Sequence, residues 1–504
     1  MTDTQPRAIS PEQRAIDELV ARKVAGRPGP SYRDILESDG YPIPDHLELA
    51  WQDLGDENIP IERYISPEYA RLEVEKLWRR VWQMVCREED IPKPGDHIVY
   101  DIVDDSFLIT RGKDGSIKAL QNTCLHRGRR LRGRDGRVPE FRCPFHGLTW
   151  TLDGDLKDLP SEWDFQHLDK TKMCLPQAKV GTWGGYVFIN MDADCESLEE
   201  HLGVLPEHFK MTAYENRVKT AHVAQIIPCN WKVAQEAFME AWHLTQTHPQ
   251  AAPSAGDVTT QVDLYGDNVA RTLTPLGVAS PSLLGLEEQD IYENYLEGRT
   301  FYQERLGVTG TKDINKEDVE ADLPPGMTAR HKITEEIRRT LGAVLDTDLS
   351  DTPPYYLVDA LEYFVFPNFF PWAQEQTNQV YRFRPNGLDP DSCIVEIMYL
   401  TPIPDGTDRP KPAKMRMLAP GEDWADVNDL GRLSAIINQD TLNVPEVQKG
   451  LKALSRTQDS IPLASYQESR IRHFHHTLTK WVEGDGPGKD DGQHRESVAP
   501  PVVY

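Results

Sequence analysis

Four residues between positions 124 and 146 have the types and spacing of a metal site. Cys124 and His126 form a Cys-x-His pair, and after sixteen intervening residues Cys143 and His146 follow as Cys-x-x-His. Structural zinc sites usually pair the cysteines in one knuckle and the histidines in another. One cysteine and one histidine in each pair is instead typical of a [2Fe–2S] cluster in which one iron takes both thiolates and the other both imidazoles. The sequence favours the cluster, with zinc as the alternative.

A second set of candidate ligands lies toward the end of the stretch WKVAQEAFMEAWHLTQTH, residues 231–248. His243 and His248 are five residues apart, about 140° around an ideal helix, so both can face one metal only if the helix distorts or ends between them. Pro249 discourages helix beyond His248. Two histidines, one carboxylate and open coordination positions are the arrangement of non-haem Fe(II) oxygenases. The pair therefore predicts a mononuclear iron site that lacks its carboxylate ligand locally.

Together the two motifs resemble those of the Rieske non-haem iron oxygenases, the family that contains the α subunits of ring-hydroxylating oxygenases. The family's cluster motif ends in glycine, and Gly147 is present; its iron motif commonly has Tyr where Trp242 stands. The resemblance runs from about residue 60 to about residue 480. It implies a Rieske [2Fe–2S] cluster on the Cys and His pairs, and Fe(II) on His243 and His248.

The third iron ligand and an electron bridge follow from this resemblance. The segment NQDTLNVPEVQKGL resembles the family segment that supplies the aspartate ligand, which makes Asp440 the candidate and Glu446 the reserve. Glu240, three residues before His243, matches the acidic residue that in the family links an iron histidine to a cluster histidine of the neighbouring chain. The resemblance thus implies a head-to-tail homotrimer in which Glu240 connects His243 to His146 of the partner subunit. A solvated aspartate and an exposed helix glutamate are the alternatives.

The elements that must position these residues divide into four regions. Residues 1–60, rich in Pro, Asp and Glu, read as an N-terminal arm, and residues 483–504, rich in Gly, Asp and Pro, as a flexible tail. Residues 61–200 read as a small all-β Rieske domain behind a leading helix. Residues 201–482 read as a larger catalytic domain with an antiparallel sheet and covering helices. The expected fold class is α+β.

Helical patterns are expected at 66–85, 231–248, 288–306, 329–345 and 424–454. The acidic insertion near 285–348 is a candidate for shaping the entrance to the iron site. His473, His475 and His476 are expected at a solvated helix end. The five cysteines outside the cluster motif are expected to be packing residues: Cys86, Cys174, Cys195, Cys229 and Cys393.

Composition limits the partners and the compartment. The 504 residues include 55 Lys+Arg and 81 Asp+Glu, a formal net charge of −26. Such a surface repels phosphate backbones and anionic membranes, so we expect no nucleic-acid and no membrane partner. The sequence has neither a secretory-type start nor a run of about 18 apolar residues, which predicts a soluble, cytoplasmic protein.

The resemblance implies the terminal oxygenase component of a Rieske-type multicomponent oxygenase. Such a protein uses O₂ and NAD(P)H electrons, which arrive through a separate reductase with or without a ferredoxin, to hydroxylate or demethylate a small molecule. Apolar residues on the ligand segment favour a hydrophobic, aromatic or polycyclic substrate: Val233, Ala234, Ala237, Phe238 and Trp242. The alternatives are a carnitine- or choline-like quaternary amine monooxygenase, suggested by Glu240, and a Rieske electron carrier without oxygenase activity. Whether a small β subunit accompanies the trimer stays open.

Overall fold

The computed structural model describes residues 10–306, 322–374, 378–404, 406–484 and 486. The chain divides into two compact units. The larger unit joins Met1–Ser66, Leu202–Arg384 and Pro390–His476, and the smaller unit joins Pro67–His201, Pro385–Asp389 and Thr477–Tyr504. The N-terminal segment therefore belongs to the larger unit. Most of the expected tail, residues 487–504, lies outside the described residues.

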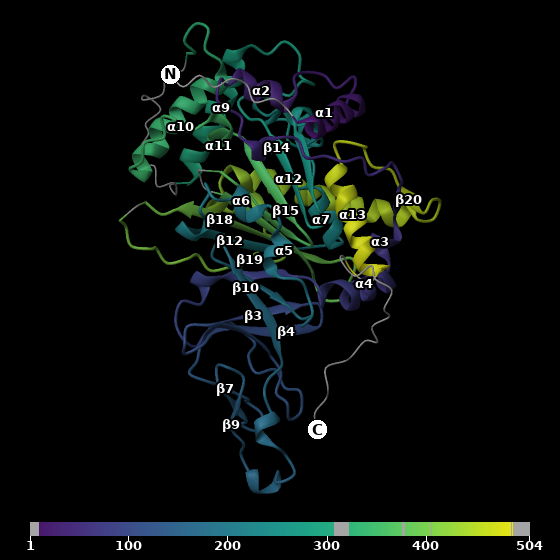
Figure 1. Ribbon diagram of the computed structural model, residues 1–504, viewed down its shortest axis with the longest axis vertical. Helices are drawn as coiled ribbons and strands as arrows, with labels where there is room; N and C mark the ends of the chain where they lie inside the picture. The colour runs from purple at the N-terminus through teal and green to yellow at the C-terminus, as the bar shows by residue number, and fades with distance from the viewer. Residues whose placement is uncertain (1–9, 307–321, 375–377, 405, 485, 487–504) are drawn as a thin grey trace. The chain divides into compact units, whose positions relative to one another are not determined.

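An eight-stranded sheet is the centre of the larger unit (Figure 1). Most of its strand pairs are antiparallel, and β12 (Arg217–Ile227) pairs in parallel with the edge strand β19 (Arg416–Met417). In spatial order the strands are β13 (Gln261–Tyr265), β14 (Val269–Thr274), β15 (Ala360–Val365), β16 (Phe369–Pro371), β17 (Asn378–Pro385), β18 (Cys393–Pro402), β12 (Arg217–Ile227) and β19 (Arg416–Met417). Aromatic and β-branched residues dominate these segments because such side chains pack well on a pleated surface.

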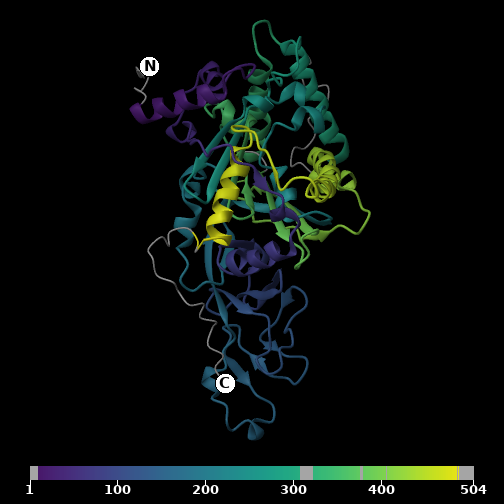
Figure 2. The ribbon, with the colours of Figure 1, turned by 90° about the vertical axis from the view of Figure 1, so that its right-hand side faces the viewer.

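Two long C-terminal helices accompany this sheet. Figure 2 shows α13 (Ser469–Val482), in yellow, running beside the strands, with α12 (Arg432–Leu454) seen nearly end-on. Phe474 of α13 packs its ring against Phe364 and Phe366, at centroid distances of 6.0 and 5.8 Å. Contacts of this kind fix α13 to the sheet and bury its apolar face. Among the described residues, no helix is both long and apolar enough to cross a bilayer.

The remaining helices of the larger unit are short, apart from an inserted pair. The inserted pair is α9 (Glu288–Leu306) and α10 (Ala329–Leu345), with the bounds that the sequence predicted. The shorter helices are α1 (Pro11–Lys23), α2 (Tyr32–Ser38), α3 (Glu62–Ile65), α6 (Leu205–His208), α7 (Trp231–Glu236), α8 (Leu244–Thr247) and α11 (Pro354–Val358). A two-residue pairing of β1 (Ile59–Pro60) with β20 (Ser460–Ile461) ties the N-terminal segment to the C-terminal part of the unit.

The smaller unit is built of short antiparallel strands, which confirms the expected β-rich domain and, with the larger unit, the α+β class. Its seven-stranded sheet has the order β2 (Gln83–Arg87), β11 (Tyr186–Asn190), β10 (Gln177–Trp183), β5 (Ile117–Gln121), β4 (Asp105–Arg111), β3 (Asp96–Ile102) and β6 (Gly136–Arg137). A three-stranded sheet contains β7 (Phe141–Arg142), β8 (Thr149–Trp150) and β9 (Leu156–Asp158). Its helices are α4 (Pro67–Glu73) and α5 (Leu198–Leu202).

Two helix predictions were wrong. The segment 66–85 starts as α4, continues as a π-helical turn at Val74–Trp78 and then enters β2, an edge strand that pairs with β11 and whose residues 83–87 are all buried. The segment 231–248 is not one helix: α7 ends at Glu236, and α8 is a single turn flanked by His243 and His248. Breaking the helix removes the angular separation that an ideal helix would impose on the two histidines.

Two expectations about polar side chains were also wrong. His473 and His475 are buried in α13 and only His476 is exposed. The two buried rings have partners on different elements: His473 Nε2 lies 2.7 Å from the Gly266 carbonyl, and His475 Nε2 lies 2.9 Å from Tyr64 Oη and from Glu236 Oε1. Cys174 is exposed and Cys195 is half-buried, whereas Cys86, Cys229 and Cys393 are buried as expected. The structure has no disulfide at any of the seven cysteines.

Candidate metal centres

The two Cys–His pairs lie on two turns with the same backbone pattern. The carbonyl of Cys124 accepts from the N–H of Gly128 at 2.9 Å, and that of Cys143 accepts from Gly147 at 3.0 Å. Both glycines have positive φ, +70° and +86°, which a residue with a side chain rarely adopts. The sequence reading identified Gly147, but not Gly128, which has the same role in the first turn.

Within each turn the cysteine is inside and the histidine outside. Cys124 and Cys143 are buried in a core that includes Phe141, Leu148 and Trp150. His126 is half-buried and His146 is exposed, and their ring centroids are 4.7 Å apart. Two thiols in the protein interior and two imidazoles near solvent match the division of a cluster into a Cys-bound and a His-bound iron.

The electrostatics of these residues suit a [2Fe–2S] cluster. Burial raises the pKa of the Cys124 thiol, while hydrogen bonds from the backbone N–H groups of His126 and Arg127 oppose this effect. Such N–H groups stabilise a thiolate and a negatively charged cluster. Burial, with the positive charge of His146 and Arg127, lowers the pKa of His126 and keeps the imidazole neutral, as a metal ligand must be. Its buried Nδ1 has no hydrogen-bond partner among the described residues, so this atom is available to a metal.

The second candidate centre brings together His243, His248 and Asp440. One ligand atom from each lies within 4.8 Å of the other two. His248 Nε2 is 3.0 Å from Asp440 Oδ1, His243 Nε2 is 3.6 Å from the same oxygen, and the two Nε2 atoms are 3.3 Å apart. Neighbouring ligands of one ion with bonds of about 2.1 Å are separated by similar distances, about 3 Å.

The hydrogen bonds on the far side of each ring decide which nitrogen is free. His243 Nδ1 is 2.6 Å from Glu240 Oε1, and His248 Nδ1 is 2.8 Å from Gln439 Oε1. A carboxylate or amide oxygen can only accept, so each Nδ1 carries the proton and each Nε2 presents a lone pair. Two lone pairs and an aspartate oxygen then converge without a donor between them. That donor set fits a divalent cation such as Fe(II).

Two separate elements supply these ligands. His243 and His248 are the caps of the single turn α8, and Asp440 lies 192 residues after His248, inside α12. The reserve candidate Glu446 points to solvent, with its carboxylate 2.7 Å from Lys449 Nζ and 69% of its side chain exposed. The structure thus brings Asp440, and not Glu446, to the two histidines.

Glu240 is nearly buried and contacts His243 with both oxygens. Besides the 2.6 Å contact to the ring, its Oε2 accepts from the His243 backbone N–H at 3.0 Å. Burial opposes protonation of His243, but the hydrogen bond and charge of Glu240 outweigh it and raise the pKa of the imidazole. Glu240 therefore fixes both the backbone and the ring of His243, which an exposed helix glutamate would not do.

The apolar residues of the ligand segment fall into different environments. Val233 and Ala234 are buried in packing, whereas Trp242 has 53% of its surface exposed. Phe238 is half-buried and its ring lies 5.1 Å from that of Tyr381 and 5.0 Å from that of Phe383. Among the described apolar residues of this segment, Phe238 joins an aromatic group on the sheet.

Gln439 is the contact residue that sequence reasoning missed. A glutamine on a helix carries no chemical signal by itself, and only its place directly before Asp440 could have indicated it. Gln250, which contacts Gln439 at 2.7 Å, lies two residues beyond His248. Both residues follow from the positions of the ligands once the tertiary structure is known.

Comparison with known proteins assigns the family. Residues 207–484, more than half of the chain, match the family described as ring hydroxylating alpha subunit (catalytic domain), and residues 81–169 match the Rieske [2Fe-2S] domain. The chain therefore belongs to the ring-hydroxylating alpha subunit family and carries a Rieske domain. The resemblance drawn from the two motifs is confirmed.

Individual relatives have different substrates in their names. The chain is 34% identical over 193 residues to the chlorobenzene dioxygenase subunit alpha of Cupriavidus sp. (strain PS12), a match covering 36% of this chain and 42% of that one. It is 29% identical over 221 residues to the carnitine monooxygenase oxygenase subunit of Acinetobacter baumannii, covering 43% and 57% of the two chains. The matches thus span about half the length of these relatives.

Solved structures show the same fold. A quaternary ammonium Rieske monooxygenase in complex with L-carnitine aligns with a TM-score of 0.58 and 18% identity, covering 85% of this chain and 96% of that chain. Naphthalene 1,2-dioxygenase from Rhodococcus sp. bound to indole aligns with a TM-score of 0.55 and 19% identity, covering 94% and 98%. Two structures with such different ligands align about equally well.

Proposed function

We propose that this chain is the terminal oxygenase component of a Rieske-type multicomponent oxygenase. It uses O₂ and NAD(P)H-derived electrons to hydroxylate or demethylate a small hydrophobic molecule. The observation that carries this proposal is the convergence of two histidine Nε2 atoms and the Asp440 carboxylate, in a chain with a Rieske domain. A separate reductase, with or without a ferredoxin, delivers the electrons, in agreement with the absence of a G-x-G-x-x-G motif from the sequence.

The chain's own residues hold and orient the two groups. Cluster ligands are Cys124, His126, Cys143 and His146, and iron ligands are His243, His248 and Asp440. When bound, these groups supply one-electron transfer and O₂ activation. Glu240 and Gln439 keep a proton on the Nδ1 of each iron histidine and turn each Nε2 inward. His243, His248 and Asp440 would hold Fe(II) by three ligands, which would leave the ion accessible to solvent and O₂.

The proposed assembly is a head-to-tail homotrimer in which Glu240 bridges His243 and His146 of the partner subunit. Two observations support it: His146 is exposed, and large apolar side chains near both centres face solvent in the single chain. These are Phe145 beside the cluster histidine, 54% exposed, and Trp242 and Leu442 beside the iron ligands, 53% and 63% exposed. A second copy of the chain would bury them. Light scattering of the purified protein tests this assembly and shows whether a β subunit is required.

An apolar, aromatic substrate is the first choice. Phe238, Tyr381 and Phe383 form an aromatic group that begins five residues before His243. A quaternary amine is the second candidate, because the bridging acid here is the longer Glu240 and an amine monooxygenase has the same fold. Oxygen consumption with each substrate class, in the presence of a reductase, separates the two candidates.

Iron and acid-labile sulfide per chain, measured after anaerobic reconstitution with Fe(II), test the function as a whole. Three irons with two sulfides and a Rieske electron paramagnetic resonance signal in the reduced protein are expected. Two irons with two sulfides would leave an electron carrier without oxygenase activity. Protein that contains neither iron nor sulfide would indicate that the Cys–His pairs bind zinc.

A further inference from the structure

The loop that follows His248 is held by the inserted helix α9, which contributes no metal ligand. Asn294 of α9 donates from Nδ2 to the carbonyl of Gln250 at 3.2 Å, and its Oδ1 accepts from Ser254 Oγ at 2.8 Å. One amide side chain therefore bonds to both ends of the segment 250–254. This segment begins two residues after an iron-ligand candidate, so its position bears on the position of His248.

The same loop reaches the helix that carries Asp440. Gln250 Nε2 donates to Gln439 Oε1 at 2.7 Å, and Gln439 Nε2 lies 3.4 Å from Gln250 Oε1 in return. Gln439 Oε1 also accepts from His248 Nδ1 at 2.8 Å. A carbonyl oxygen has two lone pairs, and both are used here. The bond from Gln250 thus fixes the direction in which Gln439 presents its oxygen to the imidazole.

Helix α9 is itself firmly placed in the larger unit. Ile291 and Tyr292 pack with Ile333 and Ile337 of α10 in a buried cluster, and Glu288 Oε2 accepts from the backbone N–H of Ala329 at 2.8 Å. These contacts hold the two inserted helices together. Their packing against each other is apolar and needs no contact with the metal ligands.

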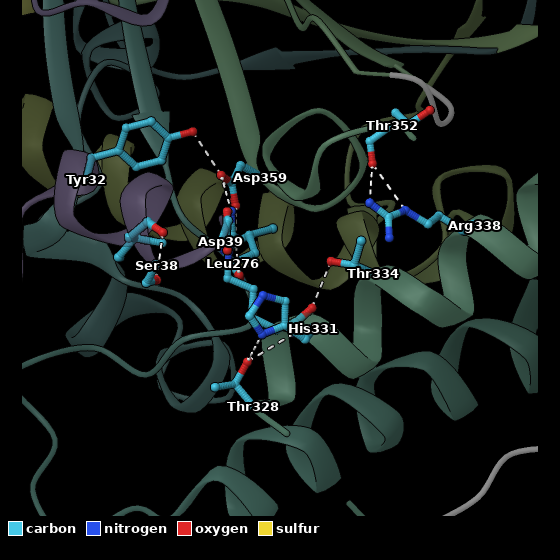
Figure 3. A network of polar contacts seen from close by, with 12 residues as sticks. Tyr32, Ser38, Asp39, Leu276, Thr328, His331, Thr334, Arg338, Thr352 and Asp359 are labelled. Carbon is cyan, nitrogen blue, oxygen red and sulfur yellow. Dashed lines mark hydrogen bonds and ion pairs between the residues drawn. The ribbon is translucent and has the colours of Figure 1, made fainter. Parts of the chain in front are cut away.

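Helix α10 is in turn anchored to the N-terminal segment and the sheet (Figure 3). Arg330 at its start pairs with Asp39 at 2.8 Å and with Asp359, which directly precedes β15. Tyr32 Oη donates to the same Asp359 at 2.8 Å. All four side chains are buried, and a buried ion pair with several hydrogen bonds restrains orientation strongly. The insertion thus has a fixed base and an outer contact at the His248 loop.

We propose that the α9–α10 insertion positions the iron site: Asn294 and Gln250 orient Gln439, and Gln439 orients His248. This inference rests on the proposed function, since it concerns Fe(II) held by the triad. Gln439 acts as a positioning residue, because it contacts a ligand and not the metal. Acceptors at the outer nitrogen of a metal-bound histidine set its tautomer and orientation and strengthen metal binding.

The two iron histidines then have unlike supports. His243 is backed by the carboxylate of Glu240 and His248 by a neutral amide. The two negative charges of Asp440 and Glu240 balance the charge of a divalent cation. The neutral amide at His248 leaves that balance unchanged. The amide therefore supplies direction without adding charge.

The test measures Fe(II) affinity rather than turnover. Protein carrying the cluster but stripped of mononuclear iron is dialysed anaerobically against graded Fe(II), for the natural chain and for Gln439→Leu, Gln439→Glu and Asn294→Ala. Gln439→Leu is expected to weaken Fe(II) binding about 10- to 100-fold, as is usual for loss of such a partner. Gln439→Glu keeps an acceptor for His248 Nδ1, so its Fe(II) affinity is expected to stay within about threefold of that of the natural chain. Asn294→Ala weakens binding less than Gln439→Leu, by about threefold to tenfold.

Glu293→Ala is the matched control, since Glu293 is exposed on α9 next to Asn294 and bonds to Gln289. Its Fe(II) affinity should equal that of the natural chain. The unfolding temperature of the metal-free variants, followed with the sulfide content, is expected to change little, which separates positioning from misfolding.

Each outcome decides between two ideas. If the natural chain binds no Fe(II) beyond its cluster, the proposed function fails and this inference with it. If the natural chain binds Fe(II) and Gln439→Leu binds it equally well, the proposed function stands and the positioning role of Gln439 is overturned. If Asn294→Ala binds Fe(II) as tightly as the natural chain while Gln439→Leu binds it more weakly, the insertion is excluded from the positioning role.

Discussion

The two candidate metal centres are built in opposite ways. In the smaller unit, all four ligands lie within the 23 residues from Cys124 to His146, on two turns whose geometry the backbone fixes through Gly128 and Gly147. In the larger unit, the ligands come from a broken helix and a second helix 192 residues away, and side-chain acceptors orient the histidines. The ligands of a centre built from local turns can be predicted from the sequence, whereas those of a centre assembled by tertiary contacts can be predicted only in part.

The comparison also concerns what surrounds each centre. The cluster histidines are close to solvent, and the cysteines rest in an apolar core. The candidate iron triad lies among ionisable groups that the fold buries, such as Glu240 and Glu362, whose charges both act on the His243 imidazole. The first centre should therefore respond mainly to changes of its own ligands, and the second also to changes of its neighbours.

The largest effect is expected from Cys143→Ser. Loss of one thiolate ligand should remove the cluster, so that acid-labile sulfide and the visible absorbance disappear and substrate oxidation stops. Because the two units have separate cores, Fe(II) binding at the triad should persist. Cys174→Ser, which changes an exposed cysteine of the same unit, serves as the control and should keep the full sulfide content. Retention of sulfide in Cys143→Ser would remove Cys143 from the ligand set.

Asp440→Ala should have the reverse effect. It removes the carboxylate that both Nε2 atoms face, so one iron per chain is lost while the sulfide and the Rieske signal stay. Substrate oxidation should fall below detection. Metal analysis with sulfide determination checks this result. Simultaneous loss of the cluster would contradict the independence of the two centres.

Glu240→Gln should leave both metal contents unchanged and slow substrate oxidation, by about 10- to 100-fold or more. The amide keeps an acceptor for His243 Nδ1 but loses the charge that supports the imidazole and the proposed bridge. Single-turnover oxidation of substrate by prereduced protein is the measurement. Glu446→Gln, an exposed acid on α12, is the matched control. An unchanged rate in Glu240→Gln would exclude Glu240 from the electron path.

The smallest effect on substrate oxidation is expected at Glu236, where the change concerns stability. Glu236 is buried between Tyr64 Oη at 3.1 Å and His475 Nε2 at 2.9 Å, and burial raises its pKa to about 8. The folded chain therefore holds a proton that the unfolded chain releases near the ordinary pKa of about 4.3. The free energy of unfolding should thus fall as the pH rises from about 4.3 to about 8, with a contribution of about 5 kcal/mol.

Glu236→Gln mimics the protonated acid and should reduce this loss. Urea unfolding at pH 5 and pH 8 measures it, with tryptophan fluorescence as the probe. The variant should be more stable than the natural chain at pH 8 and similar to it at pH 5. Glu12→Gln, an exposed acid of α1, should keep the natural pH dependence. Parallel curves for the natural chain and Glu236→Gln would show that Glu236 is ionised in the folded protein.

Much of the architecture could be predicted from the sequence. The bounds of α9 and α10 were predicted to the residue, because long periodic patterns define helices well. The helix through 231–248 could not be predicted, since the local pattern is helical and only the convergence of His243 and His248 requires a break. The buried state of His475 was missed for a related reason: its partners, Tyr64 and Glu236, are distant in sequence.

By itself the sequence determined the types of the ligands and, through the motif resemblance, the family, because Cys-x-His and Cys-x-x-His pairs specify their chemistry within a few residues. It also singled out Asp440, with Glu446 in reserve. Only the tertiary structure decided that Asp440 reaches the histidines while Glu446 faces solvent, and that Gln439 supports His248. The physical reason is that hydrogen bonds and ligand distances act over a few ångströms, and the fold brings residues far apart in the chain within that range.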